Sequence, residues 1–266
     1  MQESLYDLIP SAAGCDFVLR RQEQIRISNN VFIPRTLDDV VFVDTDTNMA
    51  CILATDLVRF TPLSMELGVK SVVQLLNEVW SIMDMQLMKY QAKPSENPLH
   101  KTIVGQHTSG ALPHTSPLQP TKMDTVGDAY VVAVLIQPDV EWPLLRSVSL
   151  MLQVARCVAE EIHAYSQQGP FGLAPGRLEM RLGMSIGQAL AGVVGMLKPR
   201  YHIYGPTAHQ AVLLESKSKA FHLHIDRATQ EFVPAPFDRH GLLIPLLPED
   251  DTAWPLSAVI ENSCAC

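Results

Sequence analysis

Apolar residues follow the two-residue period of strands in some parts of the chain and the period of amphipathic helices in others. Residues 40–43 (VVFV) and 49–55 (MACILAT) are short apolar runs on either side of a polar Asp/Thr/Asn segment. They predict two strands joined by a hairpin. Further on, residues 62–90 are predicted to form one amphipathic helix, because apolar residues recur there at helical spacing. Thr61 and Pro62 suit its start, as a capping hydroxyl and a first-turn proline. The predicted apolar face consists of Val69, Val72, Val73, Leu76, Trp80, Met83 and Leu87.

The second half of the chain continues the alternation of strands and helices. Residues 121–136 predict a strand, a turn at Gly127-Asp128 and a second strand. Four more strands are predicted at residues 177–187, 191–196, 221–226 and 241–247, and a helix at about 206–218. Another amphipathic helix is predicted from the spacing of Leu144, Val148, Met151, Ala155, Val158 and Ile162. This order predicts an α+β or α/β sandwich, with one sheet covered by helices.

The chain divides into three parts by composition. Residues 1–38 are a mixed lead-in segment, residues 39–248 carry the apolar pattern of a folded domain, and residues 249–266 are predicted to be a tail. Within the domain, residues 91–120 contain five prolines and three histidines but no apolar period. That composition predicts an inserted mobile loop.

Charge and cysteine content narrow the function classes. The formal net charge is −8, and no run of Lys or Arg compensates for it, which argues against a nucleic-acid partner. No apolar stretch approaches the roughly 18–20 residues of a membrane span. The five cysteines have no framework spacing, which is typical of reduced thiols in a cytosolic domain. If the parent protein is bound to a membrane, its anchor is expected outside this chain.

Two aspartates stand at positions suited to a metal–triphosphate site. Asp56 ends an apolar strand just before the predicted helix start at Thr61, and Asp128 lies in the turn between two strands. Mg²⁺ binds one or two carboxylates and completes its shell with water and phosphate oxygens. The N–H groups that open a helix attract phosphate. From spacing alone, simple capping of a turn by each aspartate is the stronger interpretation, and the metal site stays open beside it.

Three segments resemble the catalytic domain of class III adenylyl and guanylyl cyclases. They are ILATDLVRFTPLS, MDTVGDAYVV and RLGMSIGQALAGVVGMLKPRYHIYGPT, in the order that the family has them. The resemblance covers roughly residues 39–218. It implies a ferredoxin-like cyclase-homology domain, with a central, mostly antiparallel sheet and helices on one of its faces. It also implies an active site between two such domains.

The resemblance assigns roles to particular positions. Asp56 and Asp128 match the aspartates that hold two divalent ions, Mg²⁺ or Mn²⁺, and Leu57 would offer a metal its backbone carbonyl. Phe60 and Thr61 match the turn around the β- and γ-phosphates. The remaining nucleotide-binding candidates are Arg59, Asp124, Lys198 and His202.

Among these candidates, Asp124 is expected to determine which nucleotide base is bound. It stands where an acidic residue accompanies guanine in the family, although the family usually has the longer Glu. Lys198 is a candidate contact to the triphosphate, and a solvated loop lysine is the alternative. His202 occupies the second base-reading position, where Cys or Asp is usual.

Four positions depart from the family pattern. Arg59 replaces a glycine of the phosphate turn, which either adds a charge-assisted contact or hinders close approach of the backbone. His202 is the second departure. His209 stands where an asparagine orients the ribose, and Leu213 where an arginine neutralises charge in the transition state. Leucine cannot do that, and losing such a cation costs orders of magnitude in rate.

In the family's heterodimers, one half supplies the metal aspartates and the other supplies the asparagine and arginine, and this chain resembles the first half. This half would supply the metal aspartates and convert GTP to cyclic GMP and pyrophosphate only beside a complementary cyclase domain. The alternatives are an adenylyl cyclase half that uses ATP, and a non-catalytic pseudo-cyclase that regulates or dimerises. A different metal-dependent phosphoryl-transfer domain on a similar sheet is a further alternative.

Overall fold

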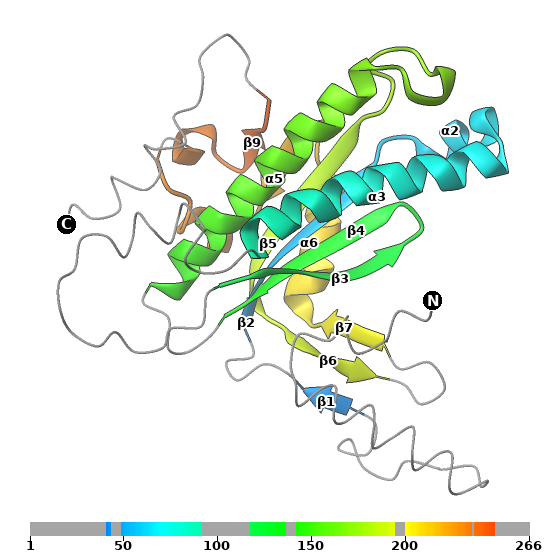
Figure 1. The fold of residues 1–266 in the computed structure, drawn as a ribbon. Helices are drawn as coiled ribbons and strands as arrows, with labels where there is room; N and C mark the ends of the chain where they lie inside the picture. The colour runs from blue at the N-terminus through cyan, green and yellow to red at the C-terminus, as the bar shows by residue number, and fades with distance from the viewer. Residues whose placement is uncertain are drawn as a thin grey trace, which may run out of the picture.

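A six-stranded, mostly antiparallel sheet forms the centre of the domain (Figure 1). The computed structural model describes residues 41–43, 49–91, 118–136, 142–194, 200–235 and 237–247. The strand order is β3-β4-β2-β5-β8-β9, and only the β5–β8 pair is parallel. The predicted α+β class is therefore confirmed. The strands are β2 (Met49–Leu57), β3 (Pro120–Val126), β4 (Ala129–Leu135), β5 (Met180–Gln188), β8 (His222–Ile225) and β9 (Leu243–Pro245).

A second, three-stranded sheet has the order β1-β6-β7. Its strands are β1 (Val41–Val43), β6 (Leu190–Val194) and β7 (Arg200–Tyr204). The predicted hairpin between β1 and β2 is wrong, because β1 pairs with β6. Both edges of β2 are already paired, one with β4 and the other with β5, so β2 has no edge left for β1.

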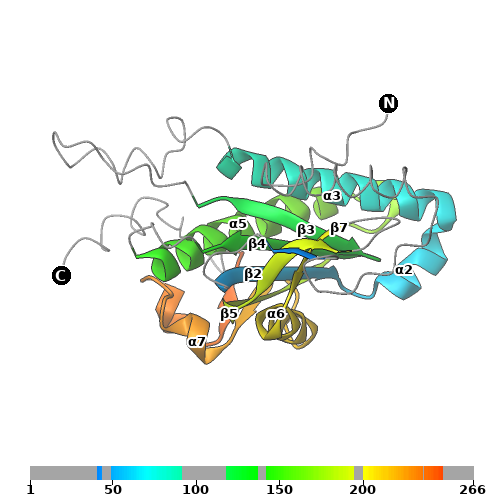
Figure 2. The same cartoon turned by 90° about the horizontal axis from the view of Figure 1, so that it is seen from below.

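Helices cover both faces of the large sheet, not one. Figure 2 shows α3 (Val69–Gln91) and α5 (Pro143–Gln167) on one face, with α6 (Pro206–Ser216) and the short α7 (Arg227–Gln230) on the other. The reason lies in β2, whose residues from Ala50 to Thr55 are all buried, so both of its faces need cover. The face under α6 is lined by small residues such as Ala54 and Ala133, which pack with Ala211.

The helix predicted over residues 62–90 is two helices. α2 (Phe60–Leu67) ends at Gly68, whose φ of 75° breaks the helix before α3 begins. No side chain caps α2, so the predicted capping role of Thr61 is wrong. The break also changes which residues face the core: Leu75, Val79, Met83 and Leu87 are buried, whereas 85% of Val69 and 61% of Val73 is exposed.

The other local predictions fare better. The hairpin with Gly127-Asp128 at its turn is present, and the predicted face of α5 is buried from Val148 to Ile162. β7 and the 3-10 turns at Pro170–Gly172 and Phe237–His240 were not predicted. The lead-in, the tail and most of the predicted inserted loop lie outside the described residues. None of the described helices is long and apolar enough to cross a bilayer.

Candidate metal and nucleotide site

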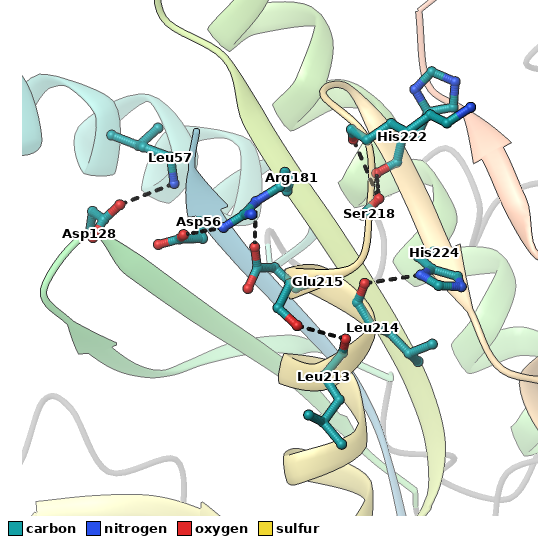
Figure 3. Close-up of polar contacts among 12 residues, drawn as sticks. Asp56, Leu57, Asp128, Arg181, Leu213, Leu214, Glu215, Ser218, His222 and His224 are labelled. Atoms are coloured by element: carbon teal, nitrogen blue, oxygen red, sulfur yellow. Dashed lines mark hydrogen bonds and ion pairs between the residues drawn. The ribbon is translucent and has the colours of Figure 1, made fainter. Parts of the chain in front are cut away.

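Asp56 and Asp128 meet where the end of β2 adjoins the β3–β4 turn. Side chains alternate along β2, so Asp56 follows Ala54 on the face that α6 covers. Gly127 makes the turn with a φ of 65°, and Asp128 comes next. The backbone N–H of Leu57 donates to Oδ2 of Asp128 at 3.3 Å (Figure 3). When protonated, the Asp128 carboxyl can donate to that of Asp56. The structure thus brings both predicted metal residues together.

This pairing changes the acidity of Asp128. Burial, then the hydrogen bond to Asp56 and the charge of Asp56, raise the pKa of Asp128 to about 6. The N–H of Leu57 acts in the opposite direction. The negative charge of Asp56 thus opposes ionisation of the half-buried Asp128, and a bound cation would offset that repulsion.

Arg181 places a positive charge beside this pair. The antiparallel register of β2 and β5 places Arg181 directly opposite Asp56. Its Nη2 lies 2.8 Å from Oδ2 of Asp56, and 29% and 23% of the two side chains are exposed. This ion pair is partly shielded from water, so salt screens it less than a surface pair.

Glu215 approaches the same guanidinium from α6. Its Oε1 lies 2.9 Å from Nε of Arg181, and only 8% of the Glu215 side chain is exposed. The N–H of Nε is not aligned for a hydrogen bond, so this contact is a close ion pair. Burial raises the pKa of Glu215 to about 7; the Arg181 charge lowers it, and the Asp56 and Asp128 charges raise it.

Arg181 and Glu215 did not emerge from the sequence as site residues. The available signal was a charged residue at the start of an otherwise apolar strand, since Arg181 precedes LGMSIG. Its partner could not be identified, because the register between β2 and β5 joins residues far apart in the chain. Glu215 is one of several polar residues near the end of α6, and nothing in the neighbouring sequence distinguishes it from the others.

The predicted phosphate turn lies at the N-terminus of α2. Arg59 is exposed and has a left-handed backbone, with φ 56° and ψ 39°, and α2 starts at the next residue. A left-handed conformation is the one that glycine adopts without strain. Arg59 therefore keeps the backbone shape that suits the glycine it replaces. Phe60 is half-buried and Thr61 exposed in the first turn.

The other predicted residues are more dispersed. His202 lies on β7 in the smaller sheet, where its ring lies 5.8 Å from that of Tyr204. His209 and Leu213 are both exposed on α6. The side chain of Asp124 and the whole of Lys198 lie outside the described part of the chain.

The donor set fits a hard divalent cation. The two aspartates offer only oxygen, which Mg²⁺ and Mn²⁺ prefer. When all three carboxyl groups are ionised, Asp56, Asp128 and Glu215 carry three negative charges against one positive charge on Arg181, which is a net charge of −2. Within the described residues no group of three or more His, Cys, Asp or Glu could hold a metal ion. A cation here would therefore need further oxygen ligands from water or phosphate.

Comparison with known proteins shows which proteins this chain is similar to. Residues 113–239 match the family model described as the adenylate and guanylate cyclase catalytic domain. The receptor-type guanylate cyclase Gyc76C of Drosophila melanogaster is 26% identical over 178 residues, which are 67% of this chain and 9% of that protein. The chain spans only about a tenth of the length of such curated relatives.

Solved cyclase structures share the fold. The catalytic core of a rhodopsin-guanylyl cyclase with converted specificity, in complex with ATPalphaS, superposes with a TM-score of 0.54 at 22% identity, covering 74% of this chain and 85% of that one. The guanylate cyclase domain of RhGC from Catenaria anguillulae, in complex with GTP, gives a TM-score of 0.52 at 24% identity, with 71% and 84% covered. The expected cyclase-type architecture is confirmed by these neighbours.

Proposed function

We propose that this chain, of which residues 113–239 match the adenylate and guanylate cyclase catalytic domain, is the metal-binding half of a guanylyl cyclase. The reaction is the conversion of GTP to cyclic GMP and pyrophosphate. The observation that carries the proposal is the Asp56–Asp128 carboxylate pair beside the first turn of α2. The pair provides oxygen ligands, and the helix start provides N–H groups for phosphate.

Each part of the site has a task in this reaction. The ribose 3′-hydroxyl releases its proton to water and attacks the α-phosphorus, the bond from that phosphorus to the bridging oxygen breaks, and pyrophosphate leaves. Divalent cations held by Asp56 and Asp128 would activate the attacking oxygen and neutralise charge on the leaving group. Leu57 fixes Asp128 through its N–H. Arg59 and Arg181 supply two guanidinium groups near the same end of β2, and guanidinium matches phosphate geometry well.

Two points favour GTP over ATP as the substrate. The curated relative Gyc76C is named a guanylate cyclase, as is the retinal guanylyl cyclase 1 of Bos taurus. Asp124 occupies the position where an acidic side chain suits guanine, because it can accept from the N1–H and the exocyclic amine. An adenylyl cyclase half, which would use ATP, is the alternative that product analysis decides.

The proposal includes a complementary domain. Leu213 has no charge to offer a transition state, and His209 and Leu213 both point away from the core of this chain. A partner cyclase-homology domain with the family's asparagine and arginine would complete the site. A homodimer of this chain would contain metal sites without that arginine.

A non-catalytic regulatory half is the competing function. The exposed Leu213 favours it, and the intact carboxylate pair favours catalysis. The two are separated by mixing this chain with candidate complementary domains and measuring cyclic GMP and cyclic AMP with Mg²⁺ and with Mn²⁺.

The matched variants for this assay are Asp56→Asn and Asp238→Asn. Asp238 is an exposed aspartate of the 3-10 turn at Phe237–His240. We expect Asp56→Asn to lower turnover of the reconstituted pair at least about 100-fold, by analogy with loss of an electrostatic catalytic group, and Asp238→Asn to leave it unchanged. Full turnover in Asp56→Asn would refute the catalytic function.

A further inference from the structure

We propose that Glu215 is a positioning residue, which keeps the Arg181 guanidinium at the site when Asp56 takes up a cation. This inference rests on the proposed function, because it assumes that Asp56 is a metal ligand. In the structure, Arg181 contacts Asp56 through Nη2 at 2.8 Å and Glu215 through Nε at 2.9 Å (Figure 3). One guanidinium therefore has two carboxylate partners from two different elements, β2 and α6.

The backbone of α6 is seated so closely on β5 that Glu215 has a fixed place. A Cβ at Gly183 would lie 2.1 Å from the backbone N of Glu215 and 2.3 Å from the backbone O of Ala211. Only glycine allows this approach, and Gly183 lies two residues from Arg181, on the same face of β5. Contact of backbone with backbone, rather than of flexible side chains, thus sets the distance between Glu215 and Arg181.

Because Glu215 is buried, it depends on Arg181 to compensate its charge. Only 8% of the Glu215 side chain is exposed, so its carboxylate has little water to replace Arg181. The guanidinium, in turn, has five N–H groups, and its contacts with the two carboxylates use Nη2 and Nε. Arg181 therefore retains donors for a further anion while both ion pairs are in place.

The two carboxylates compete for Arg181 in a way that depends on the metal. A carboxylate that binds a divalent cation has less charge left for a guanidinium, and the cation repels the guanidinium. With Asp56 engaged, Arg181 keeps Glu215 as its anchor and can present the Nη groups to phosphate. Without Glu215, Arg181 keeps its contact with Asp56 and competes with the cation for it.

The test is a double-mutant cycle on Mn²⁺ affinity, measured on the whole chain by electron paramagnetic resonance of free Mn²⁺, with no nucleotide and no partner. Glu215→Gln should weaken Mn²⁺ binding about tenfold in the native background, because Arg181 then pairs only with Asp56 and competes with the cation for it. In the Arg181→Gln background the same change should weaken it about twofold or less, since only the long-range charge is lost. Glu215→Asp should give an intermediate weakening if Glu215→Gln fails to fold.

Two controls separate the inference from its premise. Glu160→Gln removes a carboxylate that pairs with Arg156 at 2.7 Å on α5, which covers the opposite face of the sheet, and should not alter Mn²⁺ affinity. Asp56→Asn tests the metal site itself. If Asp56→Asn leaves Mn²⁺ binding intact, both the site and the inference fail. If Asp56→Asn weakens binding but Glu215→Gln has equal effects in both backgrounds, the role of Glu215 alone is refuted.

Kinetics of the reconstituted pair give a second readout. Glu215→Gln should raise the KM for GTP more than it lowers kcat, because Arg181 would be held back from the ground-state triphosphate. A residue that only stabilised the fold would lower the amount of active enzyme and leave KM unchanged. An unchanged KM with weakened Mn²⁺ binding would also contradict the proposed anchoring of Arg181 toward phosphate.

Discussion

Replacement of Gly183 by alanine tests how α6 is held over the site. The new Cβ would lie 2.1 Å from the backbone N of Glu215, against 3.4 Å for ordinary contact, so α6 must move by 3.4 − 2.1 = 1.3 Å or the strand must shift. No positive φ is involved at Gly183, so the effect is steric. Overpacking of this kind costs about 1–3 kcal/mol, and a clash with backbone belongs at the upper end.

Part of this cost is offset in the unfolded chain. A Gly→Ala change restricts the unfolded state and stabilises the protein by about 0.4–1 kcal/mol. The expected net loss is about 2 kcal/mol, which corresponds to a fall in Tm of about 4–8 °C for a domain of this size. Because Glu215 would move relative to Arg181, Mn²⁺ affinity should fall as well.

The assay is urea denaturation together with Mn²⁺ titration. Gly241→Ala is the control, since Gly241 has a φ of 68° and nothing within 4 Å of a built Cβ. It should cost about 1 kcal/mol through backbone strain and leave Mn²⁺ affinity unchanged. A loss below about 0.5 kcal/mol in Gly183→Ala, with native Mn²⁺ affinity, would refute the close seating of α6.

Three further predictions concern the same region. In the metal-free protein, the raised pKa of Asp128 stabilises the fold below its ordinary value of 3.8, and this contribution is lost as pH rises through about 6. Between pH 4 and 7, the free energy of unfolding of the native chain should therefore fall by about 1 kcal/mol more than that of Asp128→Asn, measured by urea denaturation; the figure is reduced because Asp128 is partly exposed. The same fall with pH in both proteins would contradict this. The double variant His209→Asn, Leu213→Arg should raise cyclic GMP formation by the chain alone at least about tenfold, since it restores a cation to the exposed face of α6; no gain would argue that these positions do not reach an active site. Tyr130→Phe removes the hydroxyl that donates to Asp84 on α3 and should cost about 1–2 kcal/mol in unfolding free energy; a neutral result would show that this bond does not secure the hairpin.

Local sequence signals predicted the parts of the site that depend on neighbouring residues. Asp128 was found because a glycine turn between two apolar runs places it at a hairpin tip, and Asp56 because it ends an apolar strand. Hydrophobic period also located α5 correctly. In each case the determining residues lie within a few positions of one another.

Features that depend on distant pairing were missed. The partner of β1 and the Arg181–Asp56 pair are both set by strand register between segments far apart in the chain. The split at Gly68 was missed because the apolar period continues across it, and one glycine with a φ of 75° overrides that period. α6 covers the second face of the sheet because β2 is buried on both of its faces. A short apolar run in the sequence does not show whether a strand is buried on one face or on both.

The central claim is that Asp56 and Asp128 bind divalent cations jointly, and Mn²⁺ affinity of the single and double Asn variants tests it most directly. Shared ligands predict that each single variant weakens binding at least about tenfold and that the double variant is little weaker than either, since non-additivity is expected for residues that act as a unit. Losses that simply multiply, or a single variant that binds Mn²⁺ normally, would contradict a shared site.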